Sequence, residues 1–147
     1  MKIFVVLFTF LLVMGSFCVP GQSQAGEGCS AERDAAIKQA ALNYVEGWYT
    51  GDAERMRKAL HPKLAKRWIK TLESGEVNLI EMTSEQLVES ARKRKGETVP
   101  DGQKIEVIIL DVYKKMAAVR VNSPWFVDYV HLANWNGEWL ITNVLWE

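Results

Sequence analysis

The sequence predicts an α+β domain in which N-terminal helices pack on one face of a curved antiparallel sheet. Apolar residues recur at helical spacing in the first third of the chain, whereas from Lys104 onward they alternate with polar ones, as in strands. Asn136-Gly137 lies between two runs rich in aromatic and β-branched residues, which is the strongest short-range signal for a β-hairpin. Helices followed by a meander of strands are typical of the α+β class.

Residues 1–25 are predicted to be a cleavable signal peptide. Lys2 precedes an apolar run over 3–15, and Ser23 and Ala25 supply the small residues that signal peptidase requires before its cleavage site. The run is shorter than the roughly 20 apolar residues of a spanning helix, so no stable membrane anchor is expected after cleavage. The mature protein is therefore expected to be secreted or periplasmic.

The charge and cysteine content of the mature chain exclude several classes of partner. The 147 residues carry 18 basic and 18 acidic side chains, and cleavage removes one lysine, leaving a formal charge of −1. No nucleic-acid partner is implied by this balance. Only Cys29 remains after cleavage, and the chain has two histidines, so no intrachain disulfide, metal site or other cofactor is predicted.

A linker over residues 26–32 is expected to precede the domain, which spans 33–147. Ser30 can cap the first helix, and Gly51 is expected to end it. The apolar side of this helix, predicted to lie on the sheet, is formed by residues at helical spacing, namely Ile37, Ala41, Tyr44, Val45 and Trp48.

Two further helical segments are expected after this turn. Asp52 is a suitable N-cap for a second helix, which His61-Pro62 should end. Residues 63–70 are then expected to form one or two more helical turns, because Leu64, Trp68 and Leu72 recur at a spacing of four.

The remaining segments carry clear signals for a strand, a helix and a meander. A short strand is expected over 77–82, and residues 83–86 have the sequence of a capping box that opens a third helix ending before Gly96. Strands are then expected over 105–112 and 116–122, followed by the terminal hairpin.

The two-residue loop of the terminal hairpin sets an expected register, with Trp135 opposite Glu138. The side chains expected on the helix-facing side are the pairs Asn134/Trp139, Leu132/Ile141, Val130/Asn143 and Asp128/Leu145. Towards its far end this apolar face carries two polar residues, Asp128 and Asn143. A carboxylate on an apolar surface costs free energy unless it is partnered or used, so this pair is the best indication of a site.

The candidate site residues have both functional and structural interpretations. Asp128 could act as a general acid or base, with Asn143 orienting a polar group of the ligand, or it could accept hydrogen bonds from backbone donors. His61 could be a second catalytic residue in the pocket, or it could cap the preceding helix end. Tyr44, Trp48, Trp68, Met82 and Trp139 could form the wall of a pocket for a flat ligand, or they could belong to the core.

Three groups of residues together carry a resemblance to a known family. They are Gly47-Trp48 with Gly51-Asp52, the tripeptide Leu60-His61-Pro62, and Asp128-Tyr129 followed by Gly137-Glu-Trp-Leu-Ile141. In this order they resemble the putative lumazine-binding family of the nuclear transport factor 2-like superfamily, over nearly all of the mature chain. The resemblance implies a cone formed by a bent sheet around the helices, with a pocket between them. The superfamily includes SnoaL-like cyclases and ketosteroid isomerases as well as non-catalytic binding proteins.

The favoured function is the binding of a small apolar or aromatic molecule in an aromatic-lined pocket. The alternatives are a cofactor-free lyase, isomerase or hydrolase that uses Asp128 as general acid or base, and a non-catalytic assembly module. A homodimer is also expected, because the outer face of the terminal hairpin is too apolar to be left to water. The apolar residues expected on that outer face are Val127, Tyr129, Ala133, Trp135, Leu140, Val144 and Trp146.

Overall fold

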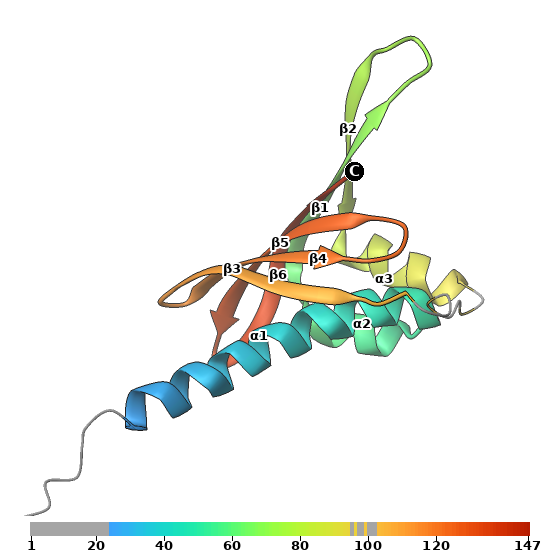
Figure 1. Cartoon of the computed structure of the whole chain (residues 1–147). Coiled ribbons are helices and arrows are strands. Elements are labelled where there is room, and N and C mark those ends of the chain that lie inside the picture. Colours follow the sequence, from blue (N-terminus) through green and yellow to red (C-terminus); the bar gives the residue numbers. More distant parts are fainter. Residues whose placement is uncertain (1–23, 95, 97–98, 100–102) are drawn as a thin grey trace, which may run out of the picture.

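The computed structural model describes residues 24–147, except 95, 97–98 and 100–102, so residues 1–23 of the signal peptide predicted over 1–25 lie outside the described residues. The α+β fold is confirmed: helices pack on one face of a sheet with strand order β2-β1-β6-β5-β4-β3 (Figure 1). Neighbouring strands are antiparallel except β1 and β6. The elements are α1 (Gln24–Thr50), α2 (Ala53–Ala59), β1 (Leu60–Thr71), β2 (Val77–Thr83), α3 (Ser84–Lys93), β3 (Glu106–Tyr113), β4 (Met116–Asn122), β5 (Val127–Trp135) and β6 (Glu138–Trp146). None of the described helices is long and apolar enough to cross a membrane.

Helix α1 runs beneath the sheet and is longer than the sequence suggested (Figure 1). It begins at Gln24, so the expected linker over 26–32 is part of the helix, and Ser30 lies within it rather than at its N-cap. Gly51, with a φ of 70°, separates α1 from α2, and the Asp52 carboxylate accepts a hydrogen bond from the Arg55 amide at 2.9 Å. The two helices pack closely because Gly47 has no side chain: a Cβ there would lie 2.9 Å from the Met56 nitrogen. The predicted caps of α2 and α3 are both present.

The segment after α2 is a strand, so the expectation of further helical turns over 63–70 is wrong. Strand β1 pairs in parallel with β6 and antiparallel with β2. The spacing of four between Leu64 and Trp68 fits a strand as well as a helix, because residues two and four apart share one face of a strand. The strand also turns Lys66 towards the helices, since it lies midway between Leu64 and Trp68. The β1–β2 hairpin projects beyond the body of the domain (Figure 1).

The terminal hairpin has the predicted turn but only part of the predicted register. Asn136 and Gly137 have φ values of 53° and 95°, and the expected pairs hold from Trp135/Glu138 as far as Leu132/Ile141. Thr142 is then an extra residue, and its hydroxyl donates to the His131 carbonyl at 3.2 Å. Beyond this β-bulge every side chain of β6 is on the opposite face from the one expected. The observed pairs there are His131/Asn143, Val130/Val144, Tyr129/Leu145 and Asp128/Trp146.

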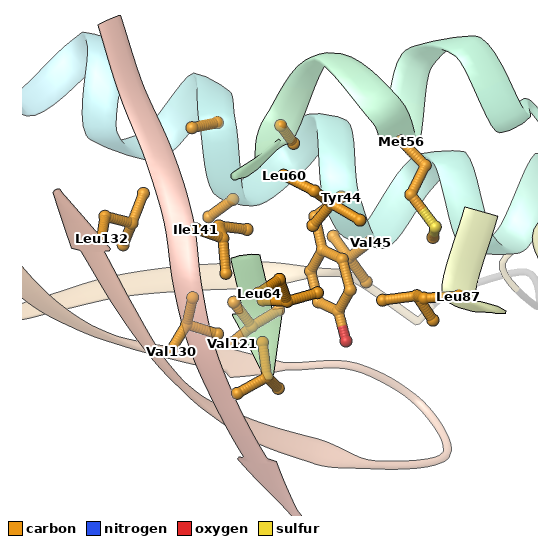
Figure 2. Packing of buried hydrophobic residues seen from close by; sticks show 14 of the residues in the cluster. Tyr44, Val45, Met56, Leu60, Leu64, Leu87, Val121, Val130, Leu132 and Ile141 are labelled. Atoms are coloured by element: carbon orange, nitrogen blue, oxygen red, sulfur yellow. The ribbon is translucent and has the colours of Figure 1, made fainter. Parts of the chain in front are cut away.

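The core lies between the helices and the concave face of the sheet. Figure 2 shows Tyr44 and Val45 of α1, Met56 of α2 and Leu87 of α3 with the strand residues Leu132 and Ile141. Trp139 is 8% exposed in this core, whereas Trp135 is 56% exposed on the other side of the sheet. The predicted inner face is therefore confirmed from the turn to Ile141.

Candidate functional site

The candidate site is built around Asp128, whose side chain is fully buried on the inner face of β5. The apolar stripe of α1 places Tyr44 opposite this strand, and the Tyr44 hydroxyl donates a hydrogen bond to Asp128 Oδ2 at 2.7 Å. The other carboxylate oxygen, Oδ1, receives no hydrogen bond from any described residue. Asp128 is therefore held from the helix side but retains an acceptor without a donor.

Lys66 of β1 completes a group of three polar side chains. Its ammonium donates to the Tyr44 hydroxyl at 2.5 Å and lies 3.6 Å from Asp128 Oδ1, and its side chain is 11% exposed. The hydrogen bonds therefore run from Lys66 to Tyr44 and from Tyr44 to Asp128. The ammonium also lies over aromatic rings, 4.9 Å from the centre of Trp146 and 5.7 Å from that of Phe126. Such cation–π contacts offset part of the hydration that a buried lysine loses.

Burial alters the ionisation of all three groups. It raises the pKa of Asp128 above its usual range, against the opposing attraction of Lys66. It lowers the pKa of Lys66, against the opposing attraction of Asp128, and raises the pKa of Tyr44 well above 10. Desolvation is the largest cause in each case, because charge is less stable away from water. Protonation of Asp128 and of Lys66 is consequently coupled.

A cavity of about 90 Å³ lies beside Lys66. The rings of Trp68 and Trp146 stack at 5.1 Å between centres with an interplanar angle of 12°, which follows from their pairing on adjacent strands. Ile80 is 42% exposed, so the cavity meets solvent along β2. Its lining is otherwise aromatic and aliphatic, and it consists of Lys66 with Trp48, Trp68, Ile80, Met82, Leu87, Phe126 and Trp146.

Besides Asp128, four of the predicted site residues lie at this place. Tyr44 contacts Asp128, and Trp48, Trp68 and Met82 line the cavity. Asp128 itself does not line it, because Lys66 is the polar residue that faces the cavity. The geometry thus joins the predicted carboxylate to the predicted aromatic wall through a lysine.

The other three predicted residues lie elsewhere. Asn143 pairs with His131 on the outer face and accepts a hydrogen bond from Arg67 at 2.7 Å, so the expectation that it shares a face with Asp128 is wrong. The His61 ring contacts Trp135 edge to face at 4.9 Å, near the hairpin turn.

His61 lies far from Asp128. Trp135 and Asp128 are seven residues apart on β5, which corresponds to roughly 23 Å of strand. Trp139 also lies near the turn, in the core, and not in the cavity beside Lys66. The structure therefore brings neither His61 nor Trp139 to Asp128.

The sequence did not single out Lys66, Phe126 or Trp146 as site residues. The alternation of Leu64, Lys66 and Trp68 carries the necessary signal for Lys66, once the segment is taken as a strand. The inward position of Trp146 depends on the bulge at Thr142, for which the sequence has no local signal. Among the described residues, no three or more His, Cys, Asp or Glu side chains gather as a metal site would require.

The chain matches a known protein family over most of its length. The sequence model of the family described as "Putative lumazine-binding" matches residues 32–147. No curated protein matches the chain in sequence.

Solved structures of similar fold include two nuclear transport factor 2-like proteins of unknown function. The protein from Shewanella baltica has a TM-score of 0.60 and 16% identity, over 80% of this chain and 94% of that one. The protein from Silicibacter pomeroyi has a TM-score of 0.60 and 17% identity, over 80% and 97%. A putative scytalone dehydratase from Novosphingobium aromaticivorans has a TM-score of 0.56 and 10% identity, over 82% and 87%. At these identities the likeness establishes the fold alone.

Proposed function

The chain belongs to the putative lumazine-binding family, and on that premise we propose that it is a domain that binds a small, flat, aromatic or apolar molecule in the cavity beside Lys66. One observation carries the proposal: an aromatic cavity contains a single charged side chain, which Tyr44 and Asp128 hold from behind. Ligand sites are commonly apolar clefts with a few polar groups placed to orient the ligand. The name of the family suggests lumazine, a flat bicyclic molecule, as a first compound to test.

The size of the cavity bears on how a ligand would enter. Its volume of about 90 Å³ is smaller than the roughly 150 Å³ cavity that takes up benzene in an engineered protein. A bicyclic ligand would therefore need the wall to move. Ile80, on the projecting β1–β2 hairpin, is the most exposed lining residue and is the expected place of movement.

We favour binding over catalysis because Asp128 is screened from the cavity by Lys66. A general acid or base must reach the reacting atom directly or through one water, and Asp128 does not line the cavity. His61, which was proposed to assist it, is on β1 and contacts Trp135, at the other end of β5 from Asp128. The Novosphingobium aromaticivorans protein is named as a putative scytalone dehydratase, and a likeness at 10% identity carries no activity to this chain.

Binding can be tested by titrating the protein with lumazine and related flat heterocycles while following tryptophan fluorescence and thermal unfolding. We expect saturable quenching and a higher midpoint of unfolding, because a ligand that binds only the native state stabilises it. Trp68→Leu should weaken binding, whereas Trp135→Leu, which changes the same residue type on the exposed face, should not. Equal weakening by both variants would contradict a site in this cavity.

We also propose that the protein forms a homodimer through the outer face of its sheet. The bulge changes the residues involved: Val144 is buried and Trp146 lines the cavity, while Tyr129 and Leu145 pair side by side and are 50% and 38% exposed. An exposed apolar surface of this kind favours association. Tyr129→Glu with Leu145→Lys should then give a monomer in sedimentation velocity, and a monomeric wild-type protein at micromolar concentration would contradict the proposal.

Export is a further proposal that rests on the N-terminal sequence. Lys2, the apolar run and the small residues at Ser23 and Ala25 support cleavage after residue 25. We expect the mass of the exported protein to lack these residues. Recovery of the full-length mass from the membrane fraction would contradict cleavage.

A further inference from the structure

We propose that the cavity selects planar aromatic molecules that carry a carbonyl or carboxylate oxygen, which accepts a hydrogen bond from Lys66, and that it excludes cationic ones. This proposal rests on the binding function proposed above and specifies its ligand class. It follows from three features of the site: the lining side chains carry hydrogen-bond donors, the Lys66 ammonium lies over aromatic rings, and the carboxylate of Asp128 balances the charge of Lys66.

The lining side chains offer hydrogen-bond donors but no strong acceptor. By residue type, the hydrogen-bonding groups of these side chains are the Lys66 ammonium and the indole N–H groups of Trp48, Trp68 and Trp146, all of which can only donate. The thioether of Met82 is a weak acceptor. The N–H or O–H donors of a ligand find no side-chain partner here, whereas its oxygen acceptors do. Leaving a buried donor of the ligand unpaired would cost affinity.

The place that a ligand cation would occupy is already taken. Aromatic cages bind cations over their ring faces, and here the Lys66 ammonium lies 4.9 Å from the Trp146 ring centre and 5.1 Å from that of Tyr44. A second positive charge beside it would be repelled at short range in an environment of low dielectric constant. Because the Lys66 ammonium occupies this position, the aromatic lining does not suit a ligand cation but suits a hydrogen-bond acceptor of a ligand.

Lys66 is positioned to donate, because its other contacts do not use all three of its N–H groups. One donates to the Tyr44 hydroxyl, and one can be directed at Asp128 Oδ1 at 3.6 Å. The third is taken by neither of these groups, and Lys66 lines the cavity. Asp128 balances the charge, so a neutral carbonyl leaves the site neutral, and a carboxylate adds one negative charge that protonation of buried Asp128 can offset.

Four probes of equal size test the selectivity, because each has one benzene ring and a planar or nearly isosteric three-atom group: acetophenone, benzoate, cumene and benzamidinium. The wild-type protein is titrated with each, and binding is followed by the indole N–H signals in ¹H–¹⁵N NMR spectra. We expect acetophenone or benzoate to bind at least about tenfold more tightly than cumene, as a hydrogen bond to a charged donor predicts. Benzamidinium should not bind detectably. Cumene is the most apolar of the four probes, so burial of apolar area alone would give it the highest affinity.

Acetophenone and benzoate distinguish whether the preferred acceptor is a neutral carbonyl oxygen or a carboxylate oxygen. If benzoate is preferred, its affinity should rise as the pH falls towards the range in which Asp128 takes up a proton. If acetophenone is preferred, its affinity should depend little on pH over the same range. In either case the shared requirement for an oxygen acceptor holds.

Lys66→Met should remove the preference for acetophenone and benzoate over cumene, whereas Lys63→Met, on the same strand but exposed, should keep it. If Lys66→Met does not fold because Asp128 is left unpaired, Lys66→Met with Asp128→Asn removes both charges and makes the same test. Cumene or benzamidinium binding as tightly as acetophenone in the wild-type protein would overturn the selectivity while leaving the binding function intact. Failure of all four probes and of the flat heterocycles to perturb the cavity would instead overturn the binding function.

Discussion

Tryptophan side chains have different roles at the two ends of the β5–β6 hairpin. Near the turn, Trp139 is buried against apolar neighbours and belongs to the core. At the other end, Trp146 stacks on Trp68 beside a cavity, opposite the buried carboxylate of Asp128. At the first end the tryptophan contributes to close packing of the core. At the second end the tryptophan lies beside a cavity and next to a buried polar residue. The comparison shows that stability and ligand chemistry can occupy separate parts of one ribbon.

The largest expected effect concerns the packed end. Trp139→Ala should lower the free energy of unfolding by about 3 to 5 kcal/mol, the range for deleting a large buried aromatic side chain. Trp135→Ala, four residues away but exposed on the outer face, should cost much less. Urea denaturation of the two variants provides the measurement. Similar losses would show that the two faces of this end do not differ as described.

The next effect concerns the polar end. Lys66→Met leaves Asp128 without its positive partner and should destabilise the protein by about 3 kcal/mol, at the low end for breaking a buried ion pair. The loss is limited because Asp128 can take up a proton. Lys66→Met with Asp128→Asn should recover part of the stability, since neither charge then remains, and a double-mutant cycle measured by denaturation gives the coupling. Independent, additive losses would mean that the two groups do not act as a pair.

A smaller effect is expected from pH. The pKa of Asp128 in the native state lies above the value of 3.8 that it has in the unfolded chain. Between these two values the native state binds more protons than the unfolded state, so this group's contribution to stability falls as the pH rises. The difference in unfolding free energy between wild type and Asp128→Asn should therefore decline from about pH 4 upward, by about 1.4 kcal/mol for each unit of pKa difference. A difference that grows with pH would mean that Lys66 and Tyr44 overcome the cost of burial.

Sequence reasoning predicted the packed end better than the polar end, for physical reasons. The Asn136-Gly137 turn at the packed end is a local feature, as are the Asp52 cap and the Thr83 capping box elsewhere in the chain, and each is formed by residues close in sequence. The inner position of Asp128 also follows from alternation counted from the turn.

The predictions that failed concern features that depend on long-range structure. A spacing of four could not distinguish a strand from a helix over 63–70, so Lys66 was missed. The bulge in β6 reversed the faces of Asn143 and Trp146 without any glycine or proline to signal it. The aromatic wall was therefore predicted in part, while its lysine and its second stacked tryptophan required the structure.

The bulge at Thr142 has a consequence for motion. The pairing of β6 with β5 shifts at this level, and its pairing with β1 is interrupted between Leu60 and Ala65, so the ladders on both sides of β6 are irregular at nearly the same height. Segments bounded by such irregularities can open without unfolding the whole domain. We expect the amide hydrogens of residues 143–146 to exchange with solvent faster than those of 139–141. An opening of this segment would carry Trp146 away from Trp68 and enlarge the cavity from the sheet side.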